Sequence, residues 1–129
     1  MTAQDRNNGS GRGHAVVTGT SSGIGRAVAE RLLSTGWRVT GIDRAPSAPS
    51  HPSFDSVQVD LADLQALIAR LADIGAVTAL VHAAGYMRVG RLGELQAESG
   101  EGMWRVHVGA AEALANALAP RMSDGGRIV

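Results

Sequence analysis

The stretch Thr18-Gly19-Thr20-Ser21-Ser22-Gly23-Ile24-Gly25 decides the fold, because it places a glycine-rich turn between a strand and a helix. The apolar run at residues 14–17 predicts the strand, and a helical pattern begins at Ile24. Glycine lets the backbone turn sharply and lets a ligand approach without a Cβ in the way. The free N–H groups of a first helical turn, with the helix dipole behind them, attract an anion. The stretch therefore predicts a cradle for the pyrophosphate of a dinucleotide, and the alternative for the glycines alone is a tight turn with a helix cap.

Strands and helices alternate along the rest of the chain, which favours an α/β fold with a parallel sheet covered on both faces. Strands are predicted at residues 14–18, 37–42, 56–59 and 76–81, with a fifth beginning at Arg127. Helices are predicted from Ile24 to Gly36, along the apolar positions from Leu64 to Leu71, and over residues 100–122, where Gly125-Gly126 would end the last one. Asp60 is placed to cap the second helix. Residues 45–52 hold three of the four prolines and are predicted to be loop, as are residues 86–95.

Composition excludes several classes of function. Twelve basic residues balance twelve acidic ones, so there is no electrostatic reason to expect nucleic acid or a membrane as a partner. The polar residues 1–13 lack the apolar core of a secretory signal, so we expect a disordered tail and a cytoplasmic protein. The absence of cysteine excludes disulfides, thiolate metal sites and cysteine nucleophiles, and no metal site is expected. All twelve basic residues are arginine, and Tyr86 is the one tyrosine, so the chain carries no Tyr-Lys pair.

The form Thr-Gly-x-x-x-Gly-Ile-Gly, with three residues between its first two glycines, resembles the short-chain dehydrogenase/reductase family. The resemblance covers about residues 13–129. It implies a Rossmann-type doubly wound parallel sheet in three α/β/α layers, of which residues 14–129 form the incomplete, NAD(P)-binding N-terminal half, truncated at the fifth strand. It also implies an oxidoreductase that transfers a hydride between a nicotinamide cofactor and a small-molecule alcohol or carbonyl substrate.

The resemblance assigns cofactor-binding residues to four segments. The glycines of the first segment would provide the turn, the close approach and the helix packing, while the neighbouring hydroxyls add hydrogen bonds. The alanines and glycine after the fourth strand would lie beside the adenosine ribose, and the acidic residue after the third strand would contact the adenine amino group. The residues are Gly19, Thr20, Ser21, Ser22, Gly23, Ile24, Gly25, Asp43, Arg44, Asp60, Leu61, Ala83, Ala84 and Gly85.

Asp43 bears on the choice between NAD and NADP. It ends the second strand, about 20 residues beyond the glycine loop, where a carboxylate accepts hydrogen bonds from the ribose and repels a 2′-phosphate. This favours NAD. The adjacent Arg44 can accommodate a phosphate, so NADP stays open as the alternative. An ordinary exposed Asp-Arg turn is the structural alternative.

Two histidines stand where the family commonly has asparagine. His82-Ala83 replaces the asparagine pair of Asn-Asn-Ala-Gly, and Ala83 lacks its side-chain hydrogen bonds. No second ligand is spaced to join His82 at a metal, so we expect a structural imidazole at a strand end. His107 replaces the asparagine of Val-Asn-Val-x-Gly, which helps to hold a water in the family's proton relay. His107 is therefore a candidate catalytic residue, with helix packing as the alternative.

The family's Ser, Tyr and Lys centre, with its Tyr-x-x-x-Lys motif, follows the fifth strand and would lie beyond Val129. Tyr86 comes too early and is expected beside the nicotinamide or substrate cleft. The 129-residue chain alone is therefore expected to be inactive, and to be poorly stable or self-associating. The complete protein is expected to form a homodimer or homotetramer through its alanine-rich helix. The alternatives are a non-catalytic nucleotide-binding or interaction module and a nucleotide-sugar epimerase of the extended branch, which usually shows Thr-Gly-x-x-Gly-x-x-Gly.

Overall fold

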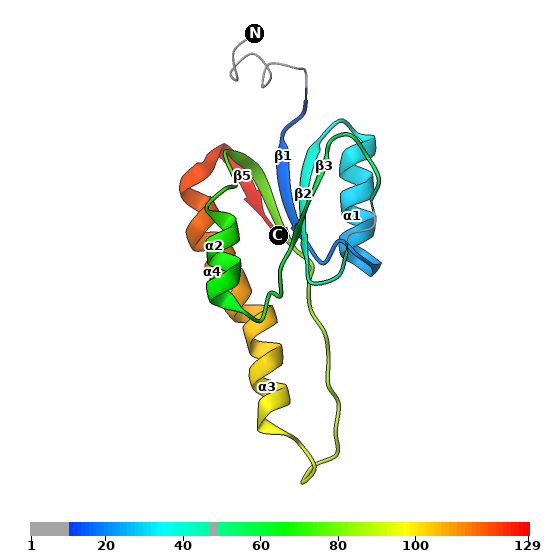
Figure 1. Cartoon of the computed structure of the whole chain (residues 1–129), viewed down its shortest axis with the longest axis vertical. Helices are drawn as coiled ribbons and strands as arrows, with labels where there is room; N and C mark the ends of the chain where they lie inside the picture. Colours follow the sequence, from blue (N-terminus) through cyan, green and yellow to red (C-terminus); the bar gives the residue numbers. More distant parts are fainter. Residues whose placement is uncertain (1–10, 47–48) are drawn as a thin grey trace.

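The computed structural model describes residues 11–46 and 49–129, and within these ranges five parallel strands form one sheet in the order β3-β2-β1-β4-β5 (Figure 1). The strands are β1 (His14–Thr18), β2 (Arg38–Asp43), β3 (Phe54–Gln58), β4 (Val77–His82) and β5 (Met122–Ile128). The helices are α1 (Gly23–Ser34), α2 (Leu64–Leu71), α3 (Ala97–Trp104) and α4 (Ala110–Leu118). A π turn (Arg105–Gly109) joins α3 to α4, and a 3₁₀ turn (Ala119–Arg121) precedes β5.

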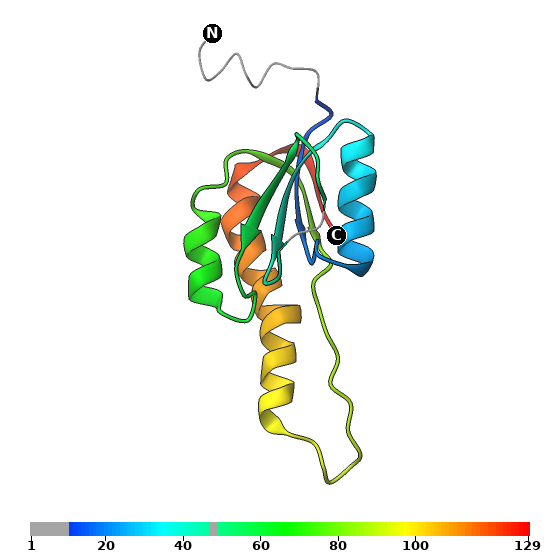
Figure 2. The ribbon, with the colours of Figure 1, turned by 45° about the vertical axis from the view of Figure 1, so that its right-hand side comes forward.

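Helices cover both faces of the sheet, which confirms the three-layer α/β/α prediction (Figures 1 and 2). Successive residues of a strand point to opposite faces, so neighbours in β1 enter different cores. One core lies under α1 and contains Ala15, Val17, Ala29, Leu33, Val39 and Ala79. The other lies under α2 and α4 and contains Val16, Ile42, Leu67, Leu71, Leu80, Leu114 and Leu118, with further apolar residues. The continuous apolar runs in the sequence are thus strands buried on both sides.

The sheet reverses its direction of winding at β1. Thr18 at the end of β1 pairs with Ile42 of β2 on one side and with His82 of β4 on the other. In an open parallel sheet, the carboxyl ends of strands at such a reversal form a crevice that binds ligands. The fold therefore places the glycine loop, the end of β2 and the exit from β4 around one point.

The residue that caps α2 differs from the prediction. Asp63, not Asp60, is the N-cap, and its carboxylate accepts a hydrogen bond from the backbone N–H of Ala66. The Asp60 carboxylate instead accepts from the N–H of Ala62, 2.9 Å away, and its carbonyl accepts from the N–H of Asp63. A short aspartate side chain can bind its own backbone two residues on, so Asp60 builds the turn that precedes the helix.

The predicted single helix at residues 100–122 is also different in the structure. It begins earlier, at Ala97, is interrupted by the π turn, and gives way to the 3₁₀ turn that contains Pro120. Proline lacks the N–H that continues a helix, and β5 begins directly afterwards at Met122. Gly125-Gly126 therefore lies inside β5, where the pairing with β4 is irregular and Gly125 has a φ of +80°.

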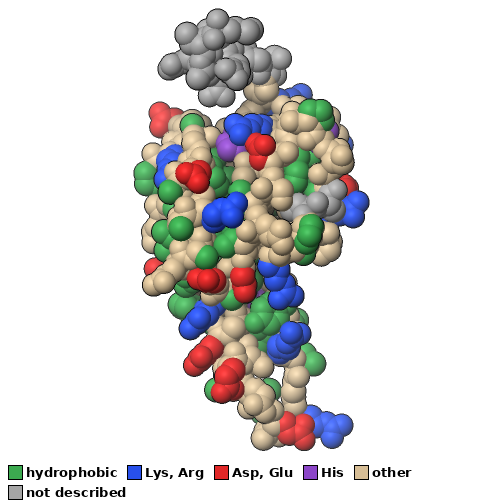
Figure 3. Space-filling model, in the orientation of Figure 1, with side chains coloured by type: hydrophobic (Ala, Val, Ile, Leu, Met, Phe, Trp, Pro, Cys, Tyr) green, Lys and Arg blue, Asp and Glu red, His purple; other side chains and the backbone are tan. Residues whose placement is uncertain are grey.

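The segment between β4 and α3, together with α3, projects from the sheet as an arm (Figures 1 and 2). Residues 86–95 contain no helix or strand, as predicted. Side chains of both charges lie along the arm in Figure 3. The large apolar side chains most exposed on it are Met87, Val89, Leu92 and Leu95. Helices of the described ranges are all too short or too polar to cross a membrane.

Two predicted irregular segments are only partly described. The loop at residues 45–52 has no helix or strand in its described part, while residues 47–48 lie outside it. Most of the predicted tail, residues 1–10, also lies outside the described residues. Near its end, the N–H of Arg12 donates to Gly36 and the carbonyl of Gly13 accepts from Arg38.

Candidate functional site

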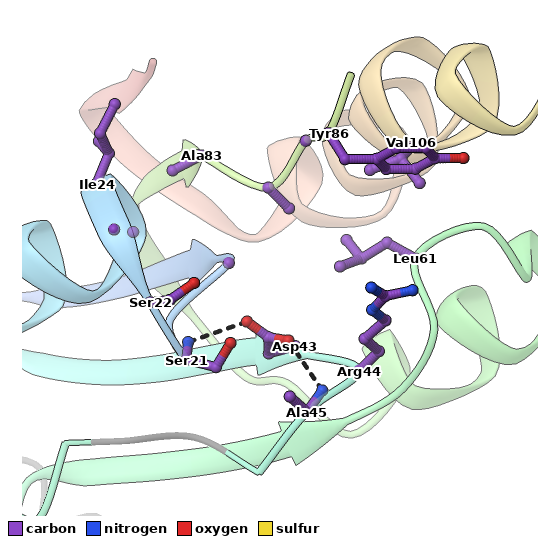
Figure 4. A pocket seen from close by; sticks show the side chains of 15 residues that line it. Ser21, Ser22, Ile24, Asp43, Arg44, Ala45, Leu61, Ala83, Tyr86 and Val106 are labelled. Carbon is purple, nitrogen blue, oxygen red and sulfur yellow. Dashed lines mark hydrogen bonds between the residues drawn. The ribbon is translucent and has the colours of Figure 1, made fainter. Parts of the chain in front are cut away.

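A cavity of about 450 Å³ opens where the carboxyl ends of β1, β2 and β4 meet (Figure 4). Its walls come from the glycine loop and first turn of α1, from the end of β2, and from the exit of β4. The lining residues are Gly19, Ser21, Ser22, Gly23, Ile24, Gly25, Asp43, Arg44, Ala45, Leu61, Ala83, Ala84, Gly85, Tyr86 and Val106. All the predicted cofactor-binding residues are among them except Thr20 and Asp60. Tyr86 also lines the cavity, and Ala45 and Val106 were not predicted to do so.

The glycine loop adopts a backbone that other residues rarely tolerate. Gly19 and Gly23 have φ values of +76° and +58°, in the left-handed region. A Cβ on Gly25 would overlap the carbonyl oxygen of Gly19, so α1 starts directly against the loop. A Cβ on Gly19 would lie 3.0 Å from the backbone nitrogen of Ala84. These glycines therefore bring β1, α1 and the exit from β4 together at the cavity floor.

The first turn of α1 is not capped by a side chain. Ser22 is the N-cap residue, yet its hydroxyl makes no capping hydrogen bond, and the first turn holds no acidic residue. Ser22, Gly23 and Ile24 all line the cavity. The N–H groups and the positive end of the helix dipole thus face the cavity without an internal acceptor, which is the arrangement that binds a phosphate. This disfavours the interpretation of the glycines as a turn with a cap alone.

Asp43 connects the end of β2 to the glycine loop. Its Oδ2 accepts from the N–H of Ser21 and its Oδ1 from the N–H of Ala45, each at 2.9 Å (Figure 4). Burial opposes the charge, but the hydrogen bonds from Ala45 and Ser21 and the nearby Arg44 outweigh it and lower the pKa of Asp43. Asp43 is only 8% exposed, so the interpretation as an ordinary exposed turn is wrong for this residue. It is an ionised carboxylate in the cavity wall.

Thr20 and Asp60 point elsewhere. Thr20 is fully buried. Its hydroxyl lies so close to Gly41 of β2 that a Cβ on Gly41 would overlap the hydroxyl oxygen. The hydroxyl is therefore not directed at the cavity. Asp60 binds the N–H of Ala62, and only its neighbour Leu61 reaches the lining. The sequence pattern could not show the direction of either side chain.

His82 lies at the end of β4, as predicted, with both ring nitrogens in hydrogen bonds. Nδ1 is 2.8 Å from the hydroxyl of Thr18, and Nε2 is 2.9 Å from the carbonyl oxygen of Val106. The Thr18 hydroxyl also accepts from the N–H of Ala84 at 3.0 Å. Burial lowers the pKa of His82, so the neutral ring is favoured.

His107 lies in the π turn, against the exit from β4. Its Nε2 donates to the carbonyl oxygen of Tyr86, 2.9 Å away, and its ring fills the space that a Cβ on Gly85 would take. π turns are rare and frequently occur at functional sites. The guanidinium of Arg88 lies 5.1 Å from the centre of the Tyr86 ring, within cation–π range. The imidazole thus lies beside the cavity residues Gly85 and Tyr86.

Comparisons with known proteins agree with this geometry. A family model described as short chain dehydrogenase matches residues 13–129. A solved short-chain dehydrogenase/reductase from Serratia marcescens is 30% identical, with a TM-score of 0.78 over 89% of this chain and 55% of that chain. A short chain dehydrogenase from Burkholderia cenocepacia, in complex with NADP, is 29% identical, with a TM-score of 0.76 over 88% of this chain and 52% of that one.

A third similar structure is a blue fluorescent protein from a metagenomic library, in complex with NADPH. It is 27% identical, with a TM-score of 0.78 over 92% of this chain and 54% of that one. The chain therefore spans about half the length of the solved structures it matches. The comparison with curated proteins gives no match. Across the part of the chain that the structure describes, no three His, Cys, Asp or Glu residues are grouped as a metal would need.

Proposed function

Because the chain belongs to the short-chain dehydrogenase family, as its match over residues 13–129 shows, we propose that it is the dinucleotide-binding part of an NAD(P)-dependent oxidoreductase. The observation that carries the proposal is the uncapped first turn of α1, which faces the cavity beside the buried carboxylate of Asp43. The first turn would hold the pyrophosphate, and Asp43 the adenosine ribose. When bound, the cofactor supplies the hydride chemistry between an alcohol and a carbonyl.

The same geometry supports a preference for NAD. Each carboxylate oxygen of Asp43 accepts one backbone N–H and keeps a further lone pair for a ribose hydroxyl. A 2′-phosphate at that place would meet the negative charge of Asp43. Arg44 also lines the cavity and supports NADP as the alternative. We expect NAD to bind at least about tenfold more tightly than NADP, a difference of about 1.4 kcal/mol.

Calorimetric titration of the chain with each dinucleotide tests this proposal. Gly19→Ala places a side chain on a left-handed backbone, 3.0 Å from Ala84, and should abolish binding. Gly75→Ala is the matched control, because a Cβ there meets nothing within 4 Å and the residue does not line the cavity. Saturable NAD binding that is lost only in Gly19→Ala supports the proposal. No binding of either dinucleotide to a folded chain would contradict it.

Catalysis would need groups that this chain does not carry. It has no lysine and a single tyrosine, whose ring packs beside Arg88. We therefore propose that the Tyr-Lys centre lies on a segment after Val129 and that the 129 residues alone are inactive. A Tyr-x-x-x-Lys motif in the coding sequence downstream of Val129 would separate an enzyme from a non-catalytic binding module.

His107 is the candidate for the proton relay of the complete enzyme. Its Nε2 is engaged with the carbonyl of Tyr86, so Nδ1 is the nitrogen that would hold a water. A packing role is the alternative, because the ring also fills the space over Gly85. In the complete protein, His107→Asn should keep turnover and His107→Ala should lower it. Equal turnover of both variants and the unmodified enzyme would reject the relay.

An apolar groove between α2 and α4 supports the proposed homodimer or homotetramer. It has a volume of about 410 Å³. Its lining includes Ile68 and Trp104, both about half exposed. A second copy of the chain that contributes the same helices would bury these side chains. Ile68→Asp should lower the mass measured by sedimentation, whereas Val89→Asp, on the exposed arm outside the groove, should not.

The cytoplasmic location stays a prediction.

A further inference from the structure

His82 joins three parts of the fold through one side chain and its own backbone. Its Nδ1 meets the hydroxyl of Thr18 at the end of β1, directly before the glycine loop. Its Nε2 meets the carbonyl oxygen of Val106 in the π turn. Its backbone N–H donates to the carbonyl oxygen of Val129, next to β5, at 2.9 Å. The ring therefore bridges from the start of the dinucleotide loop to the helical segment on the other side of the cavity.

The partners fix which ring nitrogen carries the proton. A carbonyl oxygen only accepts, so Nε2 must donate to Val106. The Thr18 hydroxyl accepts from the N–H of Ala84, and its own hydrogen is then free to be donated to Nδ1. Every donor and acceptor is satisfied by the neutral Nε2–H form. The buried hydroxyl of Thr18 would lose its acceptor if Nδ1 were protonated.

The π turn makes the Val106 carbonyl available. In a regular α-helix this carbonyl would accept the N–H of Ala110, four residues on. Here the N–H of Ala110 instead bonds to the carbonyl of Arg105. The imidazole of His82 thus donates to an oxygen that the irregular helix releases. Val106 is 7% exposed, so solvent has little access to the oxygen that His82 binds.

We propose that His82 is a positioning residue, which locks the π turn to the end of β1 and so fixes His107 relative to the glycine loop. The π turn holds the His107 ring against Gly85 and its Nε2 on the carbonyl of Tyr86. A shift of Val106 would move His107 with it. Both nitrogens of His82 are occupied, so the residue neither ligates a metal nor carries a proton in a reaction.

Nuclear magnetic resonance of the imidazole nitrogens tests this in the unmodified chain. His82 should show a protonated Nε2 and an unprotonated Nδ1, and should keep this pattern below its ordinary pKa of about 6.5. The titratable side chain beside it, His107, adds to the effect of burial in lowering the pKa of His82. A protonated Nδ1 in the neutral ring, or a titration at the ordinary pKa, would overturn the proposal.

Two variants divide the bridge into its halves. Asparagine can place an acceptor where Nδ1 lies but is too short to reach Val106, whereas glutamine can place a donor near the position of Nε2. His82→Gln should therefore leave the His107 and Gly85 resonances close to those of the unmodified chain, and His82→Asn should displace them. His51→Asn, at an exposed histidine outside the cavity, is the matched control. Unchanged His107 and Gly85 resonances in a folded His82→Asn variant would refute the coupling.

Dinucleotide titration separates this inference from the proposed function. Only the expected effect of His82 on cofactor binding rests on the proposed function. If the unmodified chain binds NAD, His82→Asn should weaken binding about tenfold or more while His82→Gln stays within a few-fold. Equal weakening by both variants would contradict the role of the Val106 contact. Loss of binding in the unmodified chain contradicts the proposed function alone, and the nitrogen spectra then still decide the role of His82.

Discussion

Replacing Asp43 with asparagine should destabilise the fold before any ligand is considered. The carboxylate accepts two backbone hydrogen bonds at 2.9 Å, and each bond to a charged group contributes about 1.5–3 kcal/mol, or about 3–6 kcal/mol together. In the variant, the asparagine oxygen keeps one hydrogen bond between neutral groups, which contributes about 1 kcal/mol. The second bond is lost, because the asparagine NH₂ group and the remaining backbone N–H are both donors. The cavity beside Asp43 admits water, which screens the charge. We therefore expect Asp43→Asn to lower the free energy of unfolding by about 2–3 kcal/mol.

Urea unfolding at neutral pH measures this loss. With a slope of about 1–3 kcal/mol/M, the midpoint should fall by about 0.7–3 M. Asp55→Asn is the control, because its ion pair with Arg38 is more than half exposed on both sides and exposed pairs contribute about 0–1 kcal/mol. Equal losses in the two variants would refute the reasoning.

Acid provides a second check on Asp43. Its pKa is lowered in the folded state, so its charge stabilises the fold fully above the unfolded pKa of about 3.9. This contribution disappears as the pH falls through the lower, folded pKa. The difference in unfolding free energy between the unmodified chain and Asp43→Asn should therefore narrow only at strongly acid pH. A difference that stays constant into that range would show that the charge of Asp43 is not what holds the loop.

Three further predictions concern stability and can be measured by urea or thermal unfolding. Gly85→Ala should lower the free energy of unfolding by about 1–3 kcal/mol, because the new methyl group would overpack against His107. Adding His107→Ala should recover part of that loss, and strictly additive losses in the double variant would contradict the contact. Arg121→Met should lower the free energy of unfolding by about 1–3 kcal/mol, because the guanidinium donates to the carbonyl of Leu71 at the end of α2 and to that of Ile74 just after it. The loss in Arg127→Met, at an exposed arginine, should be far smaller. Burial lowers the pKa of His14, so stability should fall as the pH drops below 6.5, less steeply in His14→Gln; equal slopes would contradict this assignment.

The order of the elements and the place of the cavity could be predicted because their signals are local. Gly19, Gly23 and Gly25 are neighbours in sequence, and the apolar runs that form β1 and β4 need no distant partner to be recognised. The short-chain dehydrogenase family then followed from the spacing of those glycines.

The remaining details depend on residues that are far apart in the chain. The Asp43 carboxylate meets the N–H of Ser21, 22 positions earlier, and no local pattern indicates that contact. Val106 in the π turn likewise meets His82, 24 positions away. Asp60 and Asp63 are equally good caps by residue type, so only the packing of α2 decides between them.

The close contacts at the cavity floor limit how the site can change. A Cβ on Gly25 would overlap Gly19 and a Cβ on Gly85 would overlap His107, while a Cβ on Gly19 would lie in tight contact with Ala84. A wall built this way has its shape before a ligand arrives, so little conformational entropy is lost on binding. The same tightness leaves the floor almost no tolerated substitutions. Changes of ligand preference, by selection or by design, would have to come from the rim of the cavity, where the side chain of Arg44 is exposed.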